Sequence, residues 1–462
     1  MRLIASIKRN DIFASNGKPA LHFCRGLCVS LQNLNISLFL LFFWAPFNLP
    51  SYLLGVSVGL SAVCCLLLPK GEIKASLSCW KPFLPLLALF VLLCLTIFYA
   101  CNRTAAIASC AGQLAFLLIP FVFFGMSPVF FSPGRIRSFS FLLVIGSLIE
   151  VIVRAVVLTR CFLSVPELEN YRLAGFWPSL NEFLSFQAIY MSFAGMKMPM
   201  HTTIEALFIN TAFIIVFLAR IYGNRFLSTP LRRRLADISL FLFAVSLLTS
   251  NSKTGQTMFV LSLLCLIVLA FCRHRRHLAG GILVTAAVFG CLLFPFVGKG
   301  IVGRFSQSLH VMNDAHKHNP GTVESDGSAL PRLYCWKIAG DMIRERPLTG
   351  WSADSHIRFK NNFIEKYPFY RNHYQHPHNQ FLFIWMTTGI TGLVLLLWFW
   401  VEAIRLASKE RRLFWWLWLF MILCFCLIDV FFYCGLFYFV ALYGILIVTR
   451  FHKQHQTVFP AG

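Results

Sequence analysis

The chain has 462 residues, of which 58% are hydrophobic and only 13% charged, and its formal net charge at pH 7 is +23. A soluble protein carries about 25% charged residues, and a mean hydropathy of +0.69 leaves more apolar surface than a soluble core can bury. Soluble enzymes, disordered chains and secreted disulfide-stapled folds are therefore excluded. The composition predicts an all-α polytopic membrane protein.

Apolar runs long enough to cross a bilayer recur along the whole chain. They lie near residues 27–46, 51–68, 83–100, 105–126, 139–158, 202–219, 237–250, 256–272, 279–298, 381–401, 413–428 and 431–449. At about 20 residues per membrane-crossing helix, these runs predict about twelve transmembrane helices. A further run at 180–198 is weaker because it contains Asn181, Glu182 and Gln187.

The positive charges of the loops set the predicted orientation. Short cytoplasmic loops retain Lys and Arg, so the excess of cations is assigned to loops and not to a nucleic-acid partner. With the N-terminus inside, the basic loops 220–235 and 273–277 are cytoplasmic only if 180–198 does not cross. We therefore predict that 180–198 is re-entrant or interfacial on the periplasmic side. Non-helical backbone at membrane depth is buried in protein or lines a cavity, so such a segment would mark a site.

One loop, residues 299–380, is much longer than the others and faces the periplasm in this topology. It holds seven of the 13 histidines. Apolar residues and a glycine recur at helical spacing in its second half: Leu333, Trp336, Gly340 and Ile343. Pro347 followed by Gly350 ends this predicted helix. The predicted parts are spans one to nine (1–298), a partly helical periplasmic loop domain (299–380), and spans ten to twelve with a cytoplasmic tail (381–462).

The polar stretch before the tenth span contains the first candidate for chemistry. His376 and His378 flank Pro377, and Asn379 stands where the N-cap of the following helix belongs. An imidazole beside the positive end of a helix dipole tends to stay neutral, so His378 is predicted to act as a general base. A structural role, in which His378 and Asn379 only cap the helix, is the first alternative.

A metal site formed by His373, His376 and His378 is the second alternative. These residues lack helical i, i+4 spacing and have no Cys or carboxylate nearby in the sequence, so the pattern does not match a zinc site. We predict neither a metal nor a cofactor.

Three cations near the predicted periplasmic face are candidates for binding phosphate. Arg172 precedes the 180–198 segment, Lys253 lies in the hairpin between the seventh and eighth spans, and Arg332 begins the predicted loop helix. The alternatives are an anchoring role at the membrane surface for Arg172 and simple solvation of the hairpin for Lys253.

Two ionisable residues lie inside the fifth predicted span. Groups of this kind at membrane depth are functional candidates by default. Glu150 and Arg154 are four residues apart, however, so we predict that they pair with each other on one helix face.

Several ordered sequence elements resemble the O-antigen ligase and polymerase superfamily. They are Arg332-x3-Trp336-Lys-Ile-Ala-Gly-Asp-Met-Ile-x3-Pro347-Leu-Thr-Gly350-Trp, then His376-Pro-His378-Asn379-Gln-Phe-Leu, then Thr388-Gly-Ile-Thr-Gly392-Leu. Upstream, Arg172-x2-Gly175-Phe is similar to the family's first arginine motif. At the second, usually Ser-Arg, this chain has Ser252-Lys253, and lysine cannot grip a diphosphate bidentately.

The resemblance implies a metal-independent, inverting glycosyltransferase of the bacterial inner membrane with its active site facing the periplasm. The implied donor is a glycan on undecaprenyl diphosphate, and the implied acceptor is a sugar of the lipid A-core. The diphosphate would be bound by Arg172, Lys253 and Arg332. His378 would orient or deprotonate the acceptor. Supporting roles are implied for His376, Asn379 and Trp336.

The sequence is also compatible with other functions. A polymerase would use a second lipid-linked glycan as acceptor, although the single large loop favours a ligase. A protein O-glycosylating ligase is a third branch. A transporter would show internal repeats and paired broken helices near the bilayer midplane, whereas the sequence shows no repeat and its polar residues gather at one face.

Overall fold

The computed structural model describes residues 19–43, 49–66, 80–124, 133–164, 202–222, 227–249, 252–272, 329–368, 374–410, 412–434, 439, 442–447 and 449–450. Every regular element in these ranges is a helix, which confirms the predicted all-α fold class. In chain order they are α2 (Pro19–Phe42), α3 (Leu49–Leu66), η1 (Lys81–Phe83), α5 (Leu84–Leu95), η2 (Thr96–Tyr99), α6 (Arg103–Gly112), α7 (Ala115–Phe124), α8 (Pro133–Ser164), α11 (Thr202–Tyr222), α12 (Pro230–Thr249), α13 (Lys253–Cys272), α16 (Ala329–Glu345), α17 (Ser355–Lys366), α18 (Gln380–Glu410), α19 (Leu413–Ile428) and α20 (Phe431–Cys434).

Six helical stretches in the described ranges are long and apolar enough to cross a membrane. They are Lys81–Tyr99, Arg103–Pro120, Gly134–Val156, Ile204–Tyr222, Thr254–Cys272 and Gln380–Glu410. The chain is therefore a multi-pass helical membrane protein. The count of twelve stays a prediction, because the predicted span 279–298 and the segment 180–198 lie outside the described residues.

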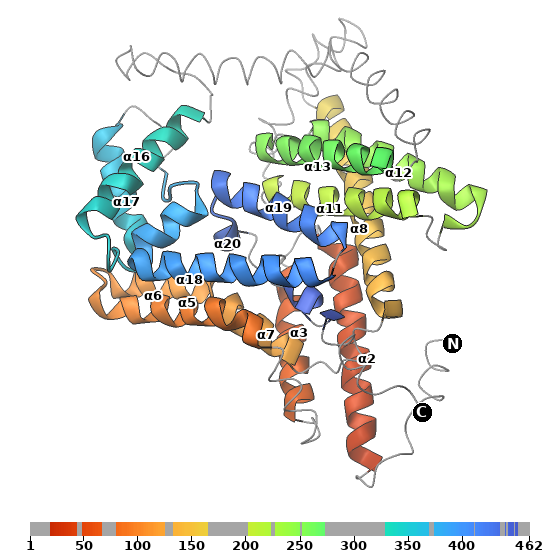
Figure 1. The fold of residues 1–462 in the computed structure, drawn as a ribbon, viewed down its shortest axis with the longest axis horizontal. Coiled ribbons are helices and arrows are strands. Elements are labelled where there is room, and N and C mark those ends of the chain that lie inside the picture. Colours follow the sequence, from red (N-terminus) through yellow and green to blue (C-terminus); the bar gives the residue numbers. More distant parts are fainter. Residues whose placement is uncertain are drawn as a thin grey trace, which may run out of the picture.

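Aromatic packing joins α18 to its neighbours. Figure 1 shows α18 running along α5, while α11 lies against α8, α12 and α13. Trp418 of α19 stacks on Phe439, with ring centroids 5.3 Å apart. Tyr443 meets Phe399 of α18 edge to face at 5.0 Å, and its hydroxyl donates a hydrogen bond to the carbonyl oxygen of Pro82. These contacts hold α18 and α19 together, and the candidate site lies at the ends of these two helices.

Arg154 of α8 forms an ion pair across helices and not along its own helix. Its Nη1 lies 2.9 Å from Oε1 of Glu205 on α11, and both side chains are buried. The predicted pairing of Arg154 with Glu150 is therefore corrected, because the packing of α8 against α11 places a carboxylate of the facing helix at the guanidinium. The ion pair ties two membrane helices together.

The predicted loop helix is confirmed as α16, which ends at Glu345, just before Pro347. Its buried side differs from the predicted stripe: Cys335, Ile338, Ala339 and Met342 are fully buried, whereas Trp336 is 37% exposed. The reason is that α16 packs on both α17 and α18, which turns the 335–338–342 face inward. The second helix, α17, was not predicted from the sequence.

Gly389 divides α18 into two segments, residues 380–388 and 390–410. Its backbone has φ 72° and ψ −169°, which no helical residue adopts. A break inside an apolar helix leaves backbone groups without intrahelical partners. Here the carbonyl oxygens of Met386 and Thr387 accept hydrogen bonds from the N–H groups of Trp351 and Ser352, at 2.8 and 2.9 Å. The loop after α16 therefore replaces the missing helical bonds.

The same loop completes the second segment of α18. The N–H of Ile390 donates to the carbonyl oxygen of Pro347 at 2.9 Å. A Cβ on Gly389 would lie 2.0 Å from the carbonyl oxygen of Leu348, and one on Gly350 would lie 2.5 Å from the backbone nitrogen of Gly389. Two glycines thus allow a backbone-to-backbone approach that side chains would block.

The end of α5 and the start of α6 hold the loop from the other side. Thr96 accepts a hydrogen bond from the N–H of Ala353 through Oγ1, at 2.9 Å. The N–H of Asn102 donates to Oδ2 of Asp354 at 2.6 Å. The segment 347–355 is therefore clamped between α18 and the α5–α6 corner.

Candidate active site

The turn that enters α18 carries His378 in an uncommon backbone conformation. Its φ is 48°, a left-handed value that residues other than glycine adopt rarely and often at functional sites. Asn379 follows, and its Oδ1 accepts hydrogen bonds from the N–H groups of Phe381 and Leu382, both at 3.0 Å. This confirms the predicted N-cap. The Asn379 amide also donates to the carbonyl oxygen of Leu427 at 3.0 Å, so the turn is fastened to the end of α19.

His378 faces a carboxylate from a distant part of the chain. Its Nδ1 lies 3.1 Å from Oδ1 of Asp429, the residue that links α19 to α20. The side chains of His378 and Asp429 are 19% and 11% exposed. The N–H of Val430 donates to the same Oδ1 at 2.8 Å, which holds the carboxylate in place. The imidazole can therefore be reached from solvent while its partner is nearly enclosed.

The charge state of Asp429 follows from these contacts. Burial by itself raises the pKa of this carboxyl group, but the hydrogen bond and charge of His378, the N–H of Val430 and the charge of His376 outweigh it and lower the pKa from 3.8 to about 2. An ionised carboxylate can only accept hydrogen bonds. In its neutral form His378 must therefore carry its proton on Nδ1, which leaves the lone pair of Nε2 free to accept another proton.

Aromatic rings surround the imidazole. The ring of His376 lies 4.3 Å from that of His378, centroid to centroid. Tyr374 meets His378 edge to face at 5.3 Å and Phe363 of α17 at 5.1 Å. The α16–α17 pair is thus in direct contact with the turn that carries His378.

Arg332 is the one predicted cation whose side chain the structure describes. It is half-buried on α16, near enough to Tyr374 to act on its hydroxyl. Burial raises the pKa of Tyr374, the neighbouring Cys335 raises it further, and the positive charge of Arg332 lowers it. Because Tyr374 touches His378, Arg332 lies in the surroundings of the imidazole. Trp336 lies on the exposed side of the same helix.

The other two predicted cations are only partly located. Lys253 is the first residue of α13, and Oγ of Ser252 caps this helix by accepting the N–H of Gly255 at 3.0 Å. The Lys253 side chain and the whole of Arg172 lie outside what the structure describes, as does His373. The backbone thus places the Lys253 position at a helix N-terminus, where the dipole favours anions.

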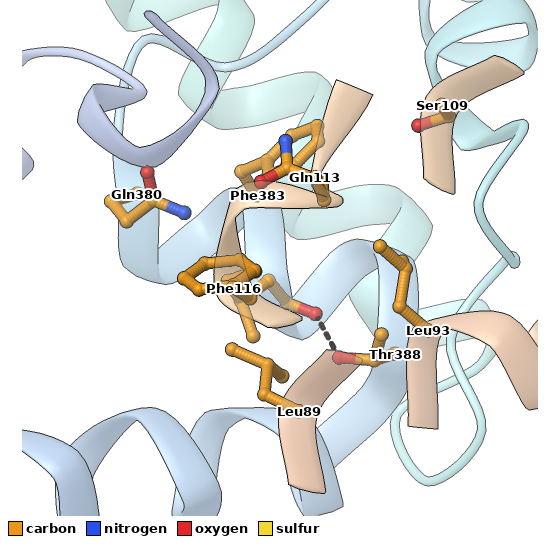
Figure 2. Close-up of a pocket in the computed structure, with 9 residues that line it drawn as sticks. Leu89, Leu93, Ser109, Gln113, Phe116, Gln380, Phe383 and Thr388 are labelled. Atoms are coloured by element: carbon orange, nitrogen blue, oxygen red, sulfur yellow. Dashed lines mark hydrogen bonds between the residues drawn. The ribbon is translucent and has the colours of Figure 1, made fainter. Parts of the chain in front are cut away.

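A small cavity with room for about one water molecule lies beside the first segment of α18, next to the His378 turn. It is lined by Leu89, Leu93, Ser109, Gln113, Phe116, Gln380, Phe383, Ile384 and Thr388. Figure 2 shows the amides of Gln113 and Gln380 on one side of it and Leu89 and Leu93 on the other. Oε1 of Gln380 accepts the N–H of Phe432 at 2.8 Å. Oε1 of Gln113 is buried and has no hydrogen-bond partner among the described residues, so a water molecule in this cavity would satisfy it.

Asp429 was not predicted from the sequence, although a signal was present. It is the only charged residue between Leu413 and Thr449, an otherwise apolar stretch of two predicted spans. An ionisable group in such surroundings is expensive and therefore a functional candidate. Gln113 is uncharged, so its place in the sequence offered no comparable reason to single it out.

Comparison with known proteins confirms the resemblance over part of the chain. Residues 238–397 match the family model described as O-Antigen ligase. A protein of Rickettsia conorii is 26% identical over 204 residues, covering 39% of this chain and 47% of its own length. One of Rickettsia typhi is 24% identical with the same coverage, and one of Rickettsia felis is 27% identical over 120 residues, covering 25% and 26%. All three are named "Putative polysaccharide ligase".

These matches cover only part of each protein. The matched part of the chain spans about half the length of the first two relatives. The family match includes Lys253, Arg332 and His378 and ends before Asp429.

Proposed function

We propose that this membrane protein is a metal-independent, inverting glycosyltransferase. It transfers a glycan from a polyprenyl diphosphate donor to a sugar of the lipid A-core, and the bacterial donor is undecaprenyl diphosphate. The observation that carries the proposal is the His378–Asp429 pair at the start of α18. His378 lies within the residues that match the O-antigen ligase family model. We place the reaction at the periplasmic face of the bacterial inner membrane, as the charge pattern of the loops predicts. Residues 299–380 form the periplasmic loop domain in this proposal.

The chemistry uses the free nitrogen of His378. An acceptor hydroxyl attacks the anomeric carbon, a new carbon–oxygen bond forms, and the bond from that carbon to the diphosphate oxygen breaks with inversion. Nε2 of His378 takes the hydroxyl proton as general base. The carboxylate of Asp429 then stabilises the imidazolium that results. The diphosphate leaves as an anion, and no covalent bond forms between the protein and either substrate.

The leaving diphosphate must be held by positive charge. We assign this role to Arg172, Lys253 and Arg332, because charge-assisted hydrogen bonds to phosphate are strong and are worth most where the developing charge lies. The position of Arg332 near Tyr374 and His378 supports this assignment.

Deletion of the gene, followed by analysis of lipids, tests the function. A ligase deletion should accumulate full-length glycan on the polyprenyl carrier, while the surface lipid carries only its core. Accumulation of single repeat units instead would identify a polymerase. An unchanged surface lipid with no accumulated carrier would reject both reactions.

Asp429→Asn is expected to lower kcat by about 10²-fold or more while leaving donor KM nearly unchanged and lowering thermal stability only modestly. Asparagine has the same shape and can still accept the N–H of Val430, but its amide can also donate to Nδ1 of His378. The imidazole then carries its proton on Nε2 and loses its basic lone pair, a tautomer change that is severe in comparable catalytic sites. Steady-state kinetics on purified protein provides the measurement. Equal losses in kcat and folded yield would point to a structural role.

The ionised state of Asp429 should persist over the working pH range. Because its pKa is lowered from 3.8 to about 2, the stability that it contributes is complete above about pH 4. That contribution falls progressively between about pH 4, where the unfolded carboxylate takes up its proton, and about pH 2, where the native carboxylate does.

Lys253→Ala is expected to reduce transfer about ten- to a hundredfold, whereas Lys253→Arg should retain activity. A lost charge-assisted contact to phosphate is worth roughly 1.5–3 kcal/mol, and arginine restores the charge. Lys337→Ala, which removes an exposed lysine of α16, is the matched control and should behave as the wild type. Full activity of Lys253→Ala in the same transfer assay would show that Lys253 does not bind the diphosphate.

A further inference from the structure

The His378 turn and Asp429 bring together three metal-ligand side chains. His376, His378 and Asp429 each offer one ligand atom, and these atoms all lie within 4.8 Å of one another. Around Zn²⁺, with ligand distances of about 2.0–2.2 Å, tetrahedral ligand atoms are about 3.4 Å apart. The 3.1 Å between Nδ1 of His378 and Oδ1 of Asp429 already fits this spacing. The remaining two distances require shifts on the order of 1 Å.

The site differs from the one that the sequence pattern offered. A zinc site at His373, His376 and His378 was disfavoured for want of a nearby carboxylate, and the fold supplies that carboxylate from 51 residues away. Two imidazoles and one carboxylate are a common set of ligands for zinc. Nitrogen donors of this kind select Zn²⁺, Cu²⁺ or Ni²⁺ over Ca²⁺ and Mg²⁺, which prefer oxygen.

Local structure pre-organises the three ligands. Pro377 between the two histidines is buried and has a fixed φ. The imidazole rings are already 4.3 Å apart, and Val430 holds the carboxylate. The two histidines are only half-buried, so an ion can enter from solvent and keep a water as its fourth ligand.

We propose that His376, His378 and Asp429 form a binding site for a divalent transition metal such as Zn²⁺, and that occupation of this site inhibits transfer. A neutral imidazole that binds a metal through Nδ1 carries its proton on Nε2. His378 would then have no lone pair with which to accept the proton of the acceptor hydroxyl. Metal binding does not depend on the proposed function, whereas the inhibition rests on the proposed function of His378.

Binding is tested with Co²⁺ as a spectroscopic probe on the full-length, metal-stripped protein in nanodiscs. We expect visible absorption bands of a four-coordinate ion that saturate at one Co²⁺ per chain and disappear when Zn²⁺ is added. His376→Ala and Asp429→Asn should each weaken this binding at least tenfold, while His356→Ala, in α17 and outside the cluster, should leave it unchanged. Equal Co²⁺ binding by the wild type and both cluster variants would overturn the site.

Inhibition is tested in the transfer assay on the same preparation. Saturating Zn²⁺ should slow transfer at least tenfold, and EDTA should restore the full rate. If Zn²⁺ accelerates transfer or EDTA abolishes it, the inhibitory role is wrong and so is the metal-independent mechanism. Failure of the proposed function appears differently, as an absence of transfer with or without EDTA while Co²⁺ still binds.

Discussion

His378→Ala is expected to abolish transfer while leaving protein yield and donor binding nearly intact. General base catalysis is worth about 10²–10⁴-fold in rate, and this imidazole is the group whose tautomer Asp429 sets. Loss of the ring also leaves the buried Asp429 without its partner, so a small decrease in thermal stability should accompany the loss of rate. The measurement is transfer from a purified lipid-linked donor at equal protein concentration, together with donor affinity.

Two variants calibrate this result. His376→Ala should cost less, because Asp429 sets the tautomer of His378, whereas His376 contacts His378 through its ring. His356→Ala should transfer at the wild-type rate. If diphosphate departure drives most of the reaction, the loss in His378→Ala will lie near the lower limit of 10²-fold. A larger loss in His376→Ala than in His378→Ala would show that the base has been assigned to the wrong histidine.

Gly389→Ala is expected to destabilise the whole protein by about 2–5 kcal/mol. This figure is the sum of the backbone strain at positive φ and the cost of overpacking. The new Cβ would lie 2.0 Å from the carbonyl oxygen of Leu348 and 2.8 Å from the nitrogen of Thr349. These are backbone atoms, so they cannot move away without breaking the hydrogen bonds that complete α18. Thermal unfolding in nanodiscs and limited proteolysis between α16 and α17 measure the effect.

Gly340→Ala is the matched control for this variant. Gly340 lies inside α16, its added Cβ would meet nothing within 4 Å, and alanine is the better helix former by up to about 1 kcal/mol. The control should be neutral or slightly stabilising. Similar unfolding temperatures for the two variants would mean that the loop 347–352 does not dock as described.

Local patterns allowed some elements to be predicted. The C-terminal end of α16 follows from helical spacing ended by a proline, although the helix begins at Ala329 and not at the predicted Arg332. The cap at Asn379 follows from a residue preference at one position. The apolar runs predicted membrane helices because hydrophobic length is a local property. Such features need no knowledge of what lies opposite them in space.

Features that depend on distant partners could not be predicted. The apolar side of α16 was assigned to Trp336 although the structure buries Cys335 and Ile338, because the side that is buried depends on where α17 and α18 lie. The Arg154–Glu205 pair depends on the packing of α8 against α11. Asp429 was missed as a partner of His378 for the same reason, since a pairing across 51 residues leaves no periodic pattern.

The His378 turn is bound to a second segment of the chain by three consecutive side chains. His378 bonds to Asp429, Asn379 to the carbonyl oxygen of Leu427, and Gln380 to the N–H of Phe432. All three partners lie beyond residue 397, where the family match ends. The site is therefore built from two separate segments of the sequence. A recombinant that exchanged residues 329–397 between relatives would receive the imidazole from one parent and its carboxylate from the other. Exchange of function between such proteins must carry the turn at 427–432 along with the histidine.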